Sequence, residues 1–262
     1  MARVFKDVAY RDGSAFPEEI RKRFLADIYA PDISVPHPAR GFPALVWLHG
    51  GALTFNDKRA DNNPSIGARL ADHGVVAAMI NYRYANQVAF PGFALDALAA
   101  LTWLRDHAVI QLGLSLDLTR LFLGGHSAGA YVAGIAGFDE TLHREAGLRP
   151  GQPAGLVLVS GQMSTHFTVS AQLGHTGRRI DEMAPIYLMH KNAPPTLFMV
   201  AANDMALREQ ENHYASEVLR TLGCRHVEYH RIFNRDHGSV HSNMDQPGDE
   251  AFERVLRFLH RF

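Results

Sequence analysis

The chain contains a single cysteine, carries almost no net charge and has no long uninterrupted apolar segment. One cysteine, Cys224, excludes an intramolecular disulfide and favours a reducing compartment. A net charge of −1 over 262 residues gives no support for binding to nucleic acid or another polyanion. No segment approaches the roughly 18 consecutive apolar residues that span a membrane, and residues 1–7 lack the apolar stretch of a secretory signal. The sequence therefore predicts a soluble, cytoplasmic protein.

Short apolar segments alternate with longer segments of helical periodicity along the chain. A length of 262 residues and a hydrophobic content of 47% allow one full domain with a buried core. This alternation is typical of an α/β fold with a mostly parallel sheet, because parallel strands need a crossover between them and helices then cover both faces. The expected strands are residues 23–29, 44–49, 75–81, 121–125, 155–160, 196–201 and 227–233.

The expected helices lie between these strands, and two segments interrupt the pattern. Helical spacing of apolar residues occurs at 64–73, 93–107, 208–222 and 250–262. No linker or repeat divides the chain, so residues 1–262 are predicted to form a single domain. Residues 1–40 and 161–195 show little periodicity. Insertions at the carboxyl ends of strands line the crevice of an open α/β sheet, so we expect both to supply cap or substrate-pocket surface, with ordinary surface loops as the alternative.

One short segment carries the strongest chemical signal in the chain. An apolar run, residues 121–124, leads into Gly125-His126-Ser127-Ala128-Gly129 and then into the helix-like residues 130–133. A G-x-S-x-G sequence between a strand and a helix is the nucleophile elbow, a tight turn that lifts the serine hydroxyl out of the sheet. Gly125 and Gly129 flank the serine because side chains there would collide with the neighbouring strand or helix. The segment predicts a serine hydrolase with Ser127 as the nucleophile.

A serine nucleophile needs a base and an acid that orients the base. In this architecture they follow the serine in the order acid, then histidine. Asp204 comes just after the expected strand 196–201, and His237 follows the expected last strand 227–233. Three strand ends therefore offer nucleophile, acid and base on one rim of the sheet, and we predict the triad Ser127, Asp204 and His237.

Other histidines and aspartates compete for the same two roles. The chain has 15 histidines, most of which must be packing or surface residues. His230 lies inside the expected last strand and points sideways, whereas His241 lies a few residues beyond the rim and is the rival for the base. Asp181 precedes its strand in irregular sequence, and Asp236 adjoins the base and suits a turn.

The loop after residues 44–48 is the expected oxyanion hole. It reads His49-Gly50-Gly51-Ala52, and paired glycines let the backbone approach a substrate oxygen without side-chain collision. The donors are predicted to be the N–H groups of Gly51 and Ala52, together with that of Ala128 after the nucleophile. Gly50 shapes the turn and His49 braces the loop.

The combination of the elbow, the predicted triad, His49-Gly50-Gly51 and Asn81-Tyr82-Arg83 resembles the pattern of the α/β-hydrolase fold. Within it the chain resembles small bacterial carboxylesterases of the hormone-sensitive-lipase-like group and their relatives, the kynurenine formamidases and feruloyl or acetyl esterases. The resemblance covers residues from about 20 to the C-terminus. It implies an eight-stranded sheet, a covalent acyl-serine intermediate, no metal and no organic cofactor. Asn81-Tyr82-Arg83-Tyr84 either is a structural anchor after its strand or supplies aromatic rings that bind substrate, and it is left out of the predicted site.

Two departures from the family pattern shape the functional prediction. Ala52 replaces a third glycine, which leaves its N–H available, and Leu53 stands where kynurenine formamidases typically have tryptophan. Short segments before His49 and at 161–195 predict a small cap and an open, shallow pocket for short acyl groups. The residues expected to line this pocket are Phe55, Met163, Phe167 and Met205.

The predicted activity is hydrolysis of small carboxylic esters. An amidase or arylformamidase with the same triad is the alternative, and a non-catalytic binding protein on the same fold is a remote third reading. The expected partner is a small-molecule substrate, and an exposed last strand or terminal helix could support a homodimer. Histidines such as His49, His126, His166 and His175 show no metal-ligand spacing.

Overall fold

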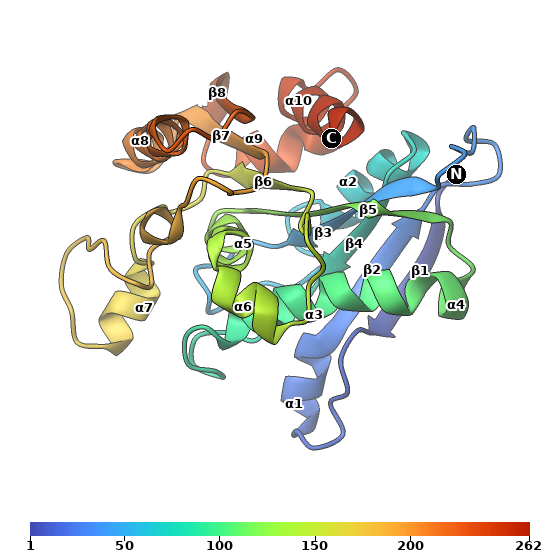
Figure 1. Ribbon diagram of the computed structural model, residues 1–262, viewed down its shortest axis with the longest axis horizontal. Coiled ribbons are helices and arrows are strands. Elements are labelled where there is room, and N and C mark those ends of the chain that lie inside the picture. The colour runs from blue at the N-terminus through green and yellow to red at the C-terminus, as the bar shows by residue number, and fades with distance from the viewer.

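A single eight-stranded sheet runs through the computed structural model, which describes residues 1–262 (Figure 1). The strand order is β1-β2-β4-β3-β5-β6-β7-β8. Strands β1 and β2 pair antiparallel, β2 pairs antiparallel with β4, and all later pairs are parallel. The strands are β1 Arg3–Ala9, β2 Leu25–Ala30, β3 Phe42–Leu48, β4 Val76–Ile80, β5 Leu116–His126, β6 Gly155–Val159, β7 Thr196–Asn203 and β8 Val227–Asp236.

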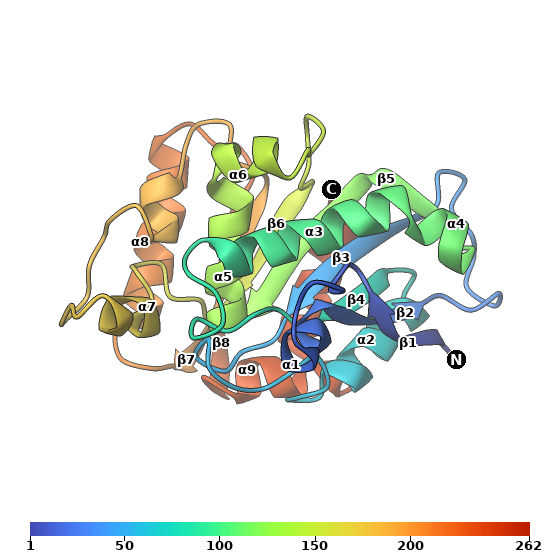
Figure 2. The same ribbon diagram turned by 90° about the horizontal axis from the view of Figure 1, so that it is seen from below.

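Helices cover both faces of the sheet (Figure 2). Helices α3, α5 and α8 pack on one face, and α2, α9 and α10 pack on the other, so that each face encloses its own apolar core. Every residue of β3, β4 and β6 is buried, as expected for parallel strands with helices on both sides. The helices are α1 Glu18–Arg21, α2 Asn63–Asp72, α3 Gly92–Asp106, α4 Ala108–Leu112, α5 Ala128–Phe138, α6 Glu140–Glu145, α7 Phe167–Gln172, α8 Arg208–Thr221, α9 Ser239–Ser242 and α10 Glu250–Arg261.

The predicted fold class is confirmed, with changes at the strand ends. All seven predicted strands are present, but β5 begins at Leu116 rather than at 121, and β8 continues to Asp236 rather than ending at 233. The eighth strand, β1, had no predicted range. Its sequence, RVFKDVA, lies at an edge with most side chains exposed, so it lacks the apolar pattern by which buried strands are recognised.

The two irregular segments have different places in the fold. Residues 1–40 form the antiparallel pair β1 and β2 at the edge of the sheet, together with the short helix α1. Residues 161–195 contain only the short helix α7 and a 3₁₀ turn, Pro185–Leu188, and they lie beside α8 (Figure 2). None of the helices has both the length and the apolar character needed to cross a membrane.

Asn81-Tyr82-Arg83-Tyr84 is a structural anchor, as its position after β4 suggested. The guanidinium of Arg83 donates to both carboxylate oxygens of Asp96 on α3, at 2.8 and 2.7 Å, and its backbone N–H donates to the same carboxylate. Arg11 adds a further hydrogen bond at 2.7 Å. Asp96 is fully buried, so its charge is compensated only by these partners. The pair fixes the loop after β4 to helix α3.

Removing one partner of this buried pair should destabilise the fold. We expect Asp96→Ala to lower the free energy of unfolding by about 3–5 kcal/mol, because two guanidinium groups lose their buried anion. Asp106→Ala is the matched control, since Asp106 is on the same helix with a side chain 39% exposed and pairs with Arg105; it should cost at most about 1 kcal/mol. Urea unfolding of both variants measures the difference, and equal losses would contradict the role of the anchor.

Candidate active site

The nucleophile elbow has the strained geometry that its sequence predicts. Ser127 lies between β5 and α5 with a φ of +56°, a value that residues with side chains rarely adopt. A Cβ atom on Gly129 would lie 2.1 Å from the carbonyl oxygen of Leu48, and one on Gly125 would lie 2.7 Å from the same atom. Both positions therefore require glycine, because the first turn of α5 approaches the end of β3 so closely.

Ser127, His237 and Asp204 meet at the carboxyl ends of β5, β8 and β7. His237 Nε2 lies 2.8 Å from Ser127 Oγ, and His237 Nδ1 lies 2.6 Å from Asp204 Oδ1. The distances suit a histidine that donates its Nδ1–H to the carboxylate and accepts the serine proton at Nε2. The structure thus brings together the three residues that were predicted from chain order.

Asp204 is held by more than the histidine. Ser160, at the end of β6, donates its hydroxyl to Asp204 Oδ2 at 2.5 Å, and the backbone N–H of Met205 donates to Oδ1 at 2.7 Å. Burial opposes ionisation of the carboxyl, but the hydrogen bonds from His237 and Ser160 outweigh it, so the pKa of Asp204 lies below its ordinary value of 3.8. Asp204 is therefore ionised at neutral pH. Sequence reasoning missed Ser160, although its place at a strand end next to β7 was a signal.

The rival residues have other partners. Asp181 accepts hydrogen bonds from Thr165 Oγ1 and from the backbone N–H of Met183, and Asp236 accepts the N–H groups of the turn that follows it. His241 is buried between two rings, with Trp47 stacked at a centroid distance of 5.5 Å and His126 at 4.9 Å. None of the three contacts Ser127.

His126, inside the elbow, supports the backbone of the base. Its Nε2 lies 2.7 Å from the carbonyl oxygen of His237, to which it donates. Burial, reinforced by neighbouring His241 and His237, lowers the pKa of His126 well below 6.5, so the ring is neutral and has one N–H to give. Burial also lowers the pKa of His241 to about 3. His126 was not among the predicted site residues.

The predicted oxyanion loop adjoins the serine. A Cβ on Gly50 would lie 3.4 Å from Ser127 Cβ, and the N–H groups of Gly51 and Ala52 donate to no acceptor of the protein. Ala128 is the first residue of α5, where N–H groups have no partner within the helix. The arrangement leaves three backbone donors beside the nucleophile.

His49, the first residue of this loop, is fixed by contacts with Tyr82. Its ring stacks on Tyr82 at a centroid distance of 4.6 Å, and the Tyr82 hydroxyl donates to the His49 carbonyl at 2.8 Å. Burial lowers the pKa of His49 to about 4, so the ring is neutral at physiological pH. Tyr82 belongs to the anchor after β4, which thereby also supports the loop.

A cleft of about 470 Å³ opens over the serine. Three of the four predicted lining residues are found there and are half exposed: Phe55, Phe167 and Met205. Met163 is different, because its side chain is fully buried in the apolar core and does not line the cleft. No residue of 1–40 lines it either, since that segment forms the far edge of the sheet, and 161–195 contributes Phe167 alone.

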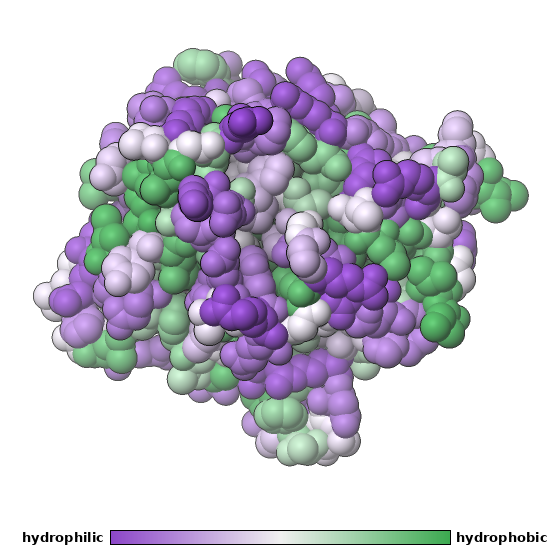
Figure 3. Space-filling view, in the orientation of Figure 1, coloured by the Kyte–Doolittle hydropathy of each residue, from purple (hydrophilic) through white to green (hydrophobic).

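The outer surface near α7 is partly apolar. Figure 3 shows polar and apolar residues interspersed over one face of the molecule, with apolar atoms on both sides of it, including the side where α7 lies. Phe167 and Leu173 are exposed there.

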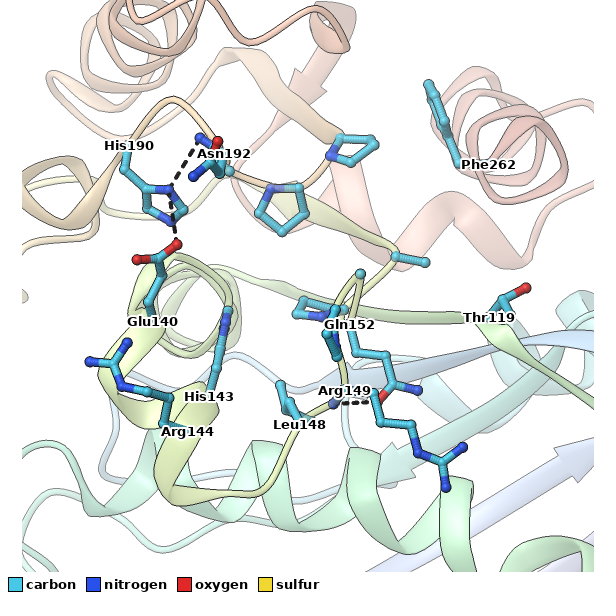
Figure 4. Close-up of a pocket in the computed structure, with 17 residues that line it drawn as sticks. Thr119, Glu140, His143, Arg144, Leu148, Arg149, Gln152, His190, Asn192 and Phe262 are labelled. Atoms are coloured by element: carbon cyan, nitrogen blue, oxygen red, sulfur yellow. Dashed lines mark hydrogen bonds and ion pairs between the residues drawn. The ribbon is translucent and has the colours of Figure 1, made fainter.

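A second cavity, of about 700 Å³, lies at the other end of the strands (Figure 4). It is lined by residues that precede β6 and β7 and by α6, with His190 facing Glu140 at 3.7 Å. It contains no serine and no pair of nucleophile and base. The amino ends of β6 and β7 face this cavity, whereas Ser127 and Asp204 lie at the carboxyl ends of their strands.

The sheet order, the elbow and the three aligned side chains are those of the α/β-hydrolase fold. A family model described as BD-FAE matches residues 26–150. An esterase from the archaeon Pyrobaculum calidifontis superposes with a TM-score of 0.72 at 21% identity, over 98% of this chain and 84% of that one, which supports the fold.

The sequence relatives of this chain include esterases and a related hydrolase. Esterase LipQ of Mycobacterium tuberculosis is 26% identical over 235 residues, which cover 81% of this chain and 53% of LipQ. A probable N-octanoylanthranilate hydrolase, AqdA2 of Rhodococcus erythropolis, is 32% identical over 118 residues, 41% of this chain and 25% of AqdA2. The chain thus spans about half the length of LipQ. These matches confirm the resemblance to serine esterases that the motifs indicated.

Loss of the Ser160 hydroxyl should weaken the alignment of the acid. In Ser160→Ala, Asp204 loses a charge-assisted hydrogen bond, so we expect kcat/KM for an activated ester to fall about tenfold. The folded-state pKa of Asp204 should rise toward 3.8. Its ionised form stabilises the fold above that value, and this stabilisation is lost as the pH falls through the folded-state pKa, so acid unfolding should begin at a higher pH.

Ser14→Ala is the control for this prediction, because the Ser14 hydroxyl bonds Asp12 on the exposed surface. Initial rates and unfolding followed by circular dichroism between pH 2 and 6 are the measurements. Unchanged rates and an unchanged acid transition in Ser160→Ala would remove Ser160 from the site.

Proposed function

We propose that this protein is a carboxylesterase that hydrolyses small esters through a covalent acyl-enzyme on Ser127. The observation that carries the proposal is the pair of distances from His237, 2.8 Å to Ser127 Oγ and 2.6 Å to Asp204 Oδ1. In the proposed roles Ser127 is the nucleophile, His237 the general base and acid, and Asp204 the group that orients His237. The esterase relatives support the same reaction class.

The first half-reaction forms the acyl-enzyme. Ser127 Oγ bonds to the ester carbonyl carbon while its proton passes to His237 Nε2, and the carbonyl π electrons move to the oxygen. The N–H groups of Gly51, Ala52 and Ala128 are the proposed donors to this oxyanion. The tetrahedral intermediate collapses, the bond to the alcohol oxygen breaks, and His237 gives its proton to the departing alcohol.

The second half-reaction releases the acid. Water gives a proton to His237 Nε2 as its oxygen bonds to the acyl carbon, and the same three N–H groups receive the oxyanion. The bond to Ser127 Oγ then breaks, and the proton returns from His237 to the serine. Ionised Asp204 stabilises the imidazolium form of His237 in both halves, which is why its hydrogen bonds and lowered pKa matter.

The cleft suits short acyl groups. Phe167 is its only lining residue from 161–195, and the single helix in that segment has six residues, so the proposed cap is small. A single domain with this cap is the proposed organisation. The cytoplasmic location and a homodimer stay predictions from the sequence.

Amide hydrolysis by the same triad is a second candidate function. AqdA2, one of the sequence relatives, has a name that describes hydrolysis of an N-acyl compound. Both functions need the same nucleophile and base, and they differ in the leaving group, which is an amine for an amide. A binding protein without catalysis is disfavoured because the three side chains are aligned within hydrogen-bond distance.

Removal of the Ser127 hydroxyl should abolish turnover. We expect wild-type protein to hydrolyse p-nitrophenyl acetate and Ser127→Ala to lose at least about 10³-fold in kcat/KM. Ser65→Ala, an exposed serine on α2, is the control and should keep wild-type rates. Incubation with an organophosphate should add one phosphoryl group to the wild type and none to Ser127→Ala, as seen by intact-protein mass. An unmodified, inactive wild type would contradict the proposed reaction.

The value of kcat/KM should depend on the length of the acyl chain of the ester. Because the cleft has about 470 Å³ and little cap above it, we expect kcat/KM for p-nitrophenyl esters to be highest at two to four carbons and to fall beyond eight. A parallel series of acyl anilides and a formanilide measures the amide candidate. Rates on formanilide above those on acetate would favour the arylformamidase, and a maximum at long chains would contradict the small open pocket.

A further inference from the structure

At the end of the oxyanion loop, the carbonyl groups of residues 51–53 each accept a hydrogen bond. The Gly51 carbonyl accepts the N–H groups of Thr54 and Phe55 at 2.9 and 3.0 Å, and the Leu53 carbonyl accepts the N–H of Ala85 at 2.9 Å. The Ala52 carbonyl between them accepts the hydroxyl of Thr168, at 2.6 Å. Thr168 belongs to α7, 116 residues away in the chain.

Both peptide planes beside Ala52 are fixed by these contacts. A trans peptide points its C=O and N–H in opposite directions, so the bonds to the Gly51 carbonyl orient the Ala52 N–H. The bond from Thr168 orients the next plane, which carries the Ala52 carbonyl. The two planes are related only by φ and ψ of Ala52. Fixing the orientation of both planes therefore fixes the backbone conformation of Ala52.

Ala52 needs such a restraint because its backbone is strained. Its φ is +53° and that of Leu53 is +62°, in the left-handed region that residues with a Cβ avoid. Many relatives with the same loop would have glycine at this position, as the family resemblance implies, whereas this chain has alanine. A conformation of this kind persists only when surrounding contacts impose it. Thr168 supplies the contact on the side of Ala52 that faces the cap.

Thr168 is itself held in place at the start of α7. Its backbone N–H donates to His166 Nδ1 at 3.2 Å, and the His166 ring stacks on Phe167 at a centroid distance of 4.3 Å. Burial lowers the pKa of His166 to about 3, so the ring stays neutral and Nδ1 keeps its lone pair. Phe167 lines the cleft over Ser127. The residue that touches substrate space and the residue that fixes the loop are therefore neighbours on one short helix.

We propose that Thr168 is a positioning residue for the oxyanion hole, acting through the Ala52 carbonyl and coupling helix α7 to the donors beside Ser127. Its effect on the reaction rests on the proposed esterase function. Its effect on the loop is a property of the fold and can be tested without activity.

Thr168→Val tests the proposal because valine keeps the shape and removes the hydroxyl. We expect kcat for p-nitrophenyl acetate to fall about tenfold with KM changed less than twofold, which is less than the roughly 10²–10³-fold loss when an oxyanion donor itself is removed. Thr168→Ser, which keeps a hydroxyl, should restore most of the rate. Thr102→Val is the matched control, since the Thr102 hydroxyl also donates to a backbone carbonyl, that of Ala99 on α3.

An oxyanion mimic separates this role from a general packing defect. A trifluoromethyl ketone forms a tetrahedral adduct with the serine, so its inhibition constant should rise in Thr168→Val by about the same factor as kcat falls. Melting temperatures of the three variants should stay close to the wild type. A higher KM with unchanged kcat, or equal losses in Thr168→Val and Thr168→Ser, would overturn the proposal.

Crystal structures of the wild type and Thr168→Val give a readout that needs no turnover. In the variant we expect the peptide between Ala52 and Leu53 to rotate, which changes ψ of Ala52 and moves φ of Leu53 away from +62°. An unchanged loop in the variant overturns the proposal. If the wild type hydrolyses no ester while the loop moves as expected, the proposed function fails and the structural role of Thr168 stands.

Discussion

The close approach of helix α5 to the end of strand β3 is the constraint on which the site depends. There is no room for a Cβ on Gly129 against the Leu48 carbonyl, and the same carbonyl lies next to Gly125. The chain can therefore pass from β5 to α5 only through a sharp turn, with Ser127 at its tip and a positive φ. Because Leu48 is followed directly by the oxyanion loop, the contact that strains the serine also brings the loop beside it.

The remaining groups are delivered by the parallel arrangement of the strands. Carboxyl ends of neighbouring parallel strands meet at one edge of the sheet, so Ser160 after β6, Asp204 after β7 and His237 after β8 lie in a row beside the elbow. These residues are linked by hydrogen bonds. Ser160 donates to Asp204, Asp204 bonds His237 Nδ1, and His126 donates to the backbone carbonyl of His237. Asp204 and His237 are thus each anchored by a residue from a different element.

Much of this arrangement could be predicted from the sequence, and the reasons are local. The elbow has a steric signature in its glycines, and chain order places Asp204 and His237 at strand ends. Ser160, His126 and Thr168 were missed because their roles depend on contacts between segments distant in the chain, and serine, histidine and threonine are common elsewhere. Met163 was misplaced for a related reason, since an apolar residue in an irregular segment can face either the core or the cleft. Strand β1 was missed because its side chains are exposed on an edge.

The neutral histidines around the site have a consequence for unfolding. Burial holds the pKa of His49 near 4 and those of His166 and His241 near 3, and that of His126 is also far below its ordinary value of 6.5. In the unfolded chain these rings take up protons below about pH 6.5, while in the folded protein they do not. The unfolded state therefore binds more protons, and the stability of the fold falls with decreasing pH from that value, by about 1.4 kcal/mol per pH unit for each fully titrating ring. The burial that keeps these rings neutral, and so able to support the loop and the base, therefore also makes the stability of the fold depend on pH.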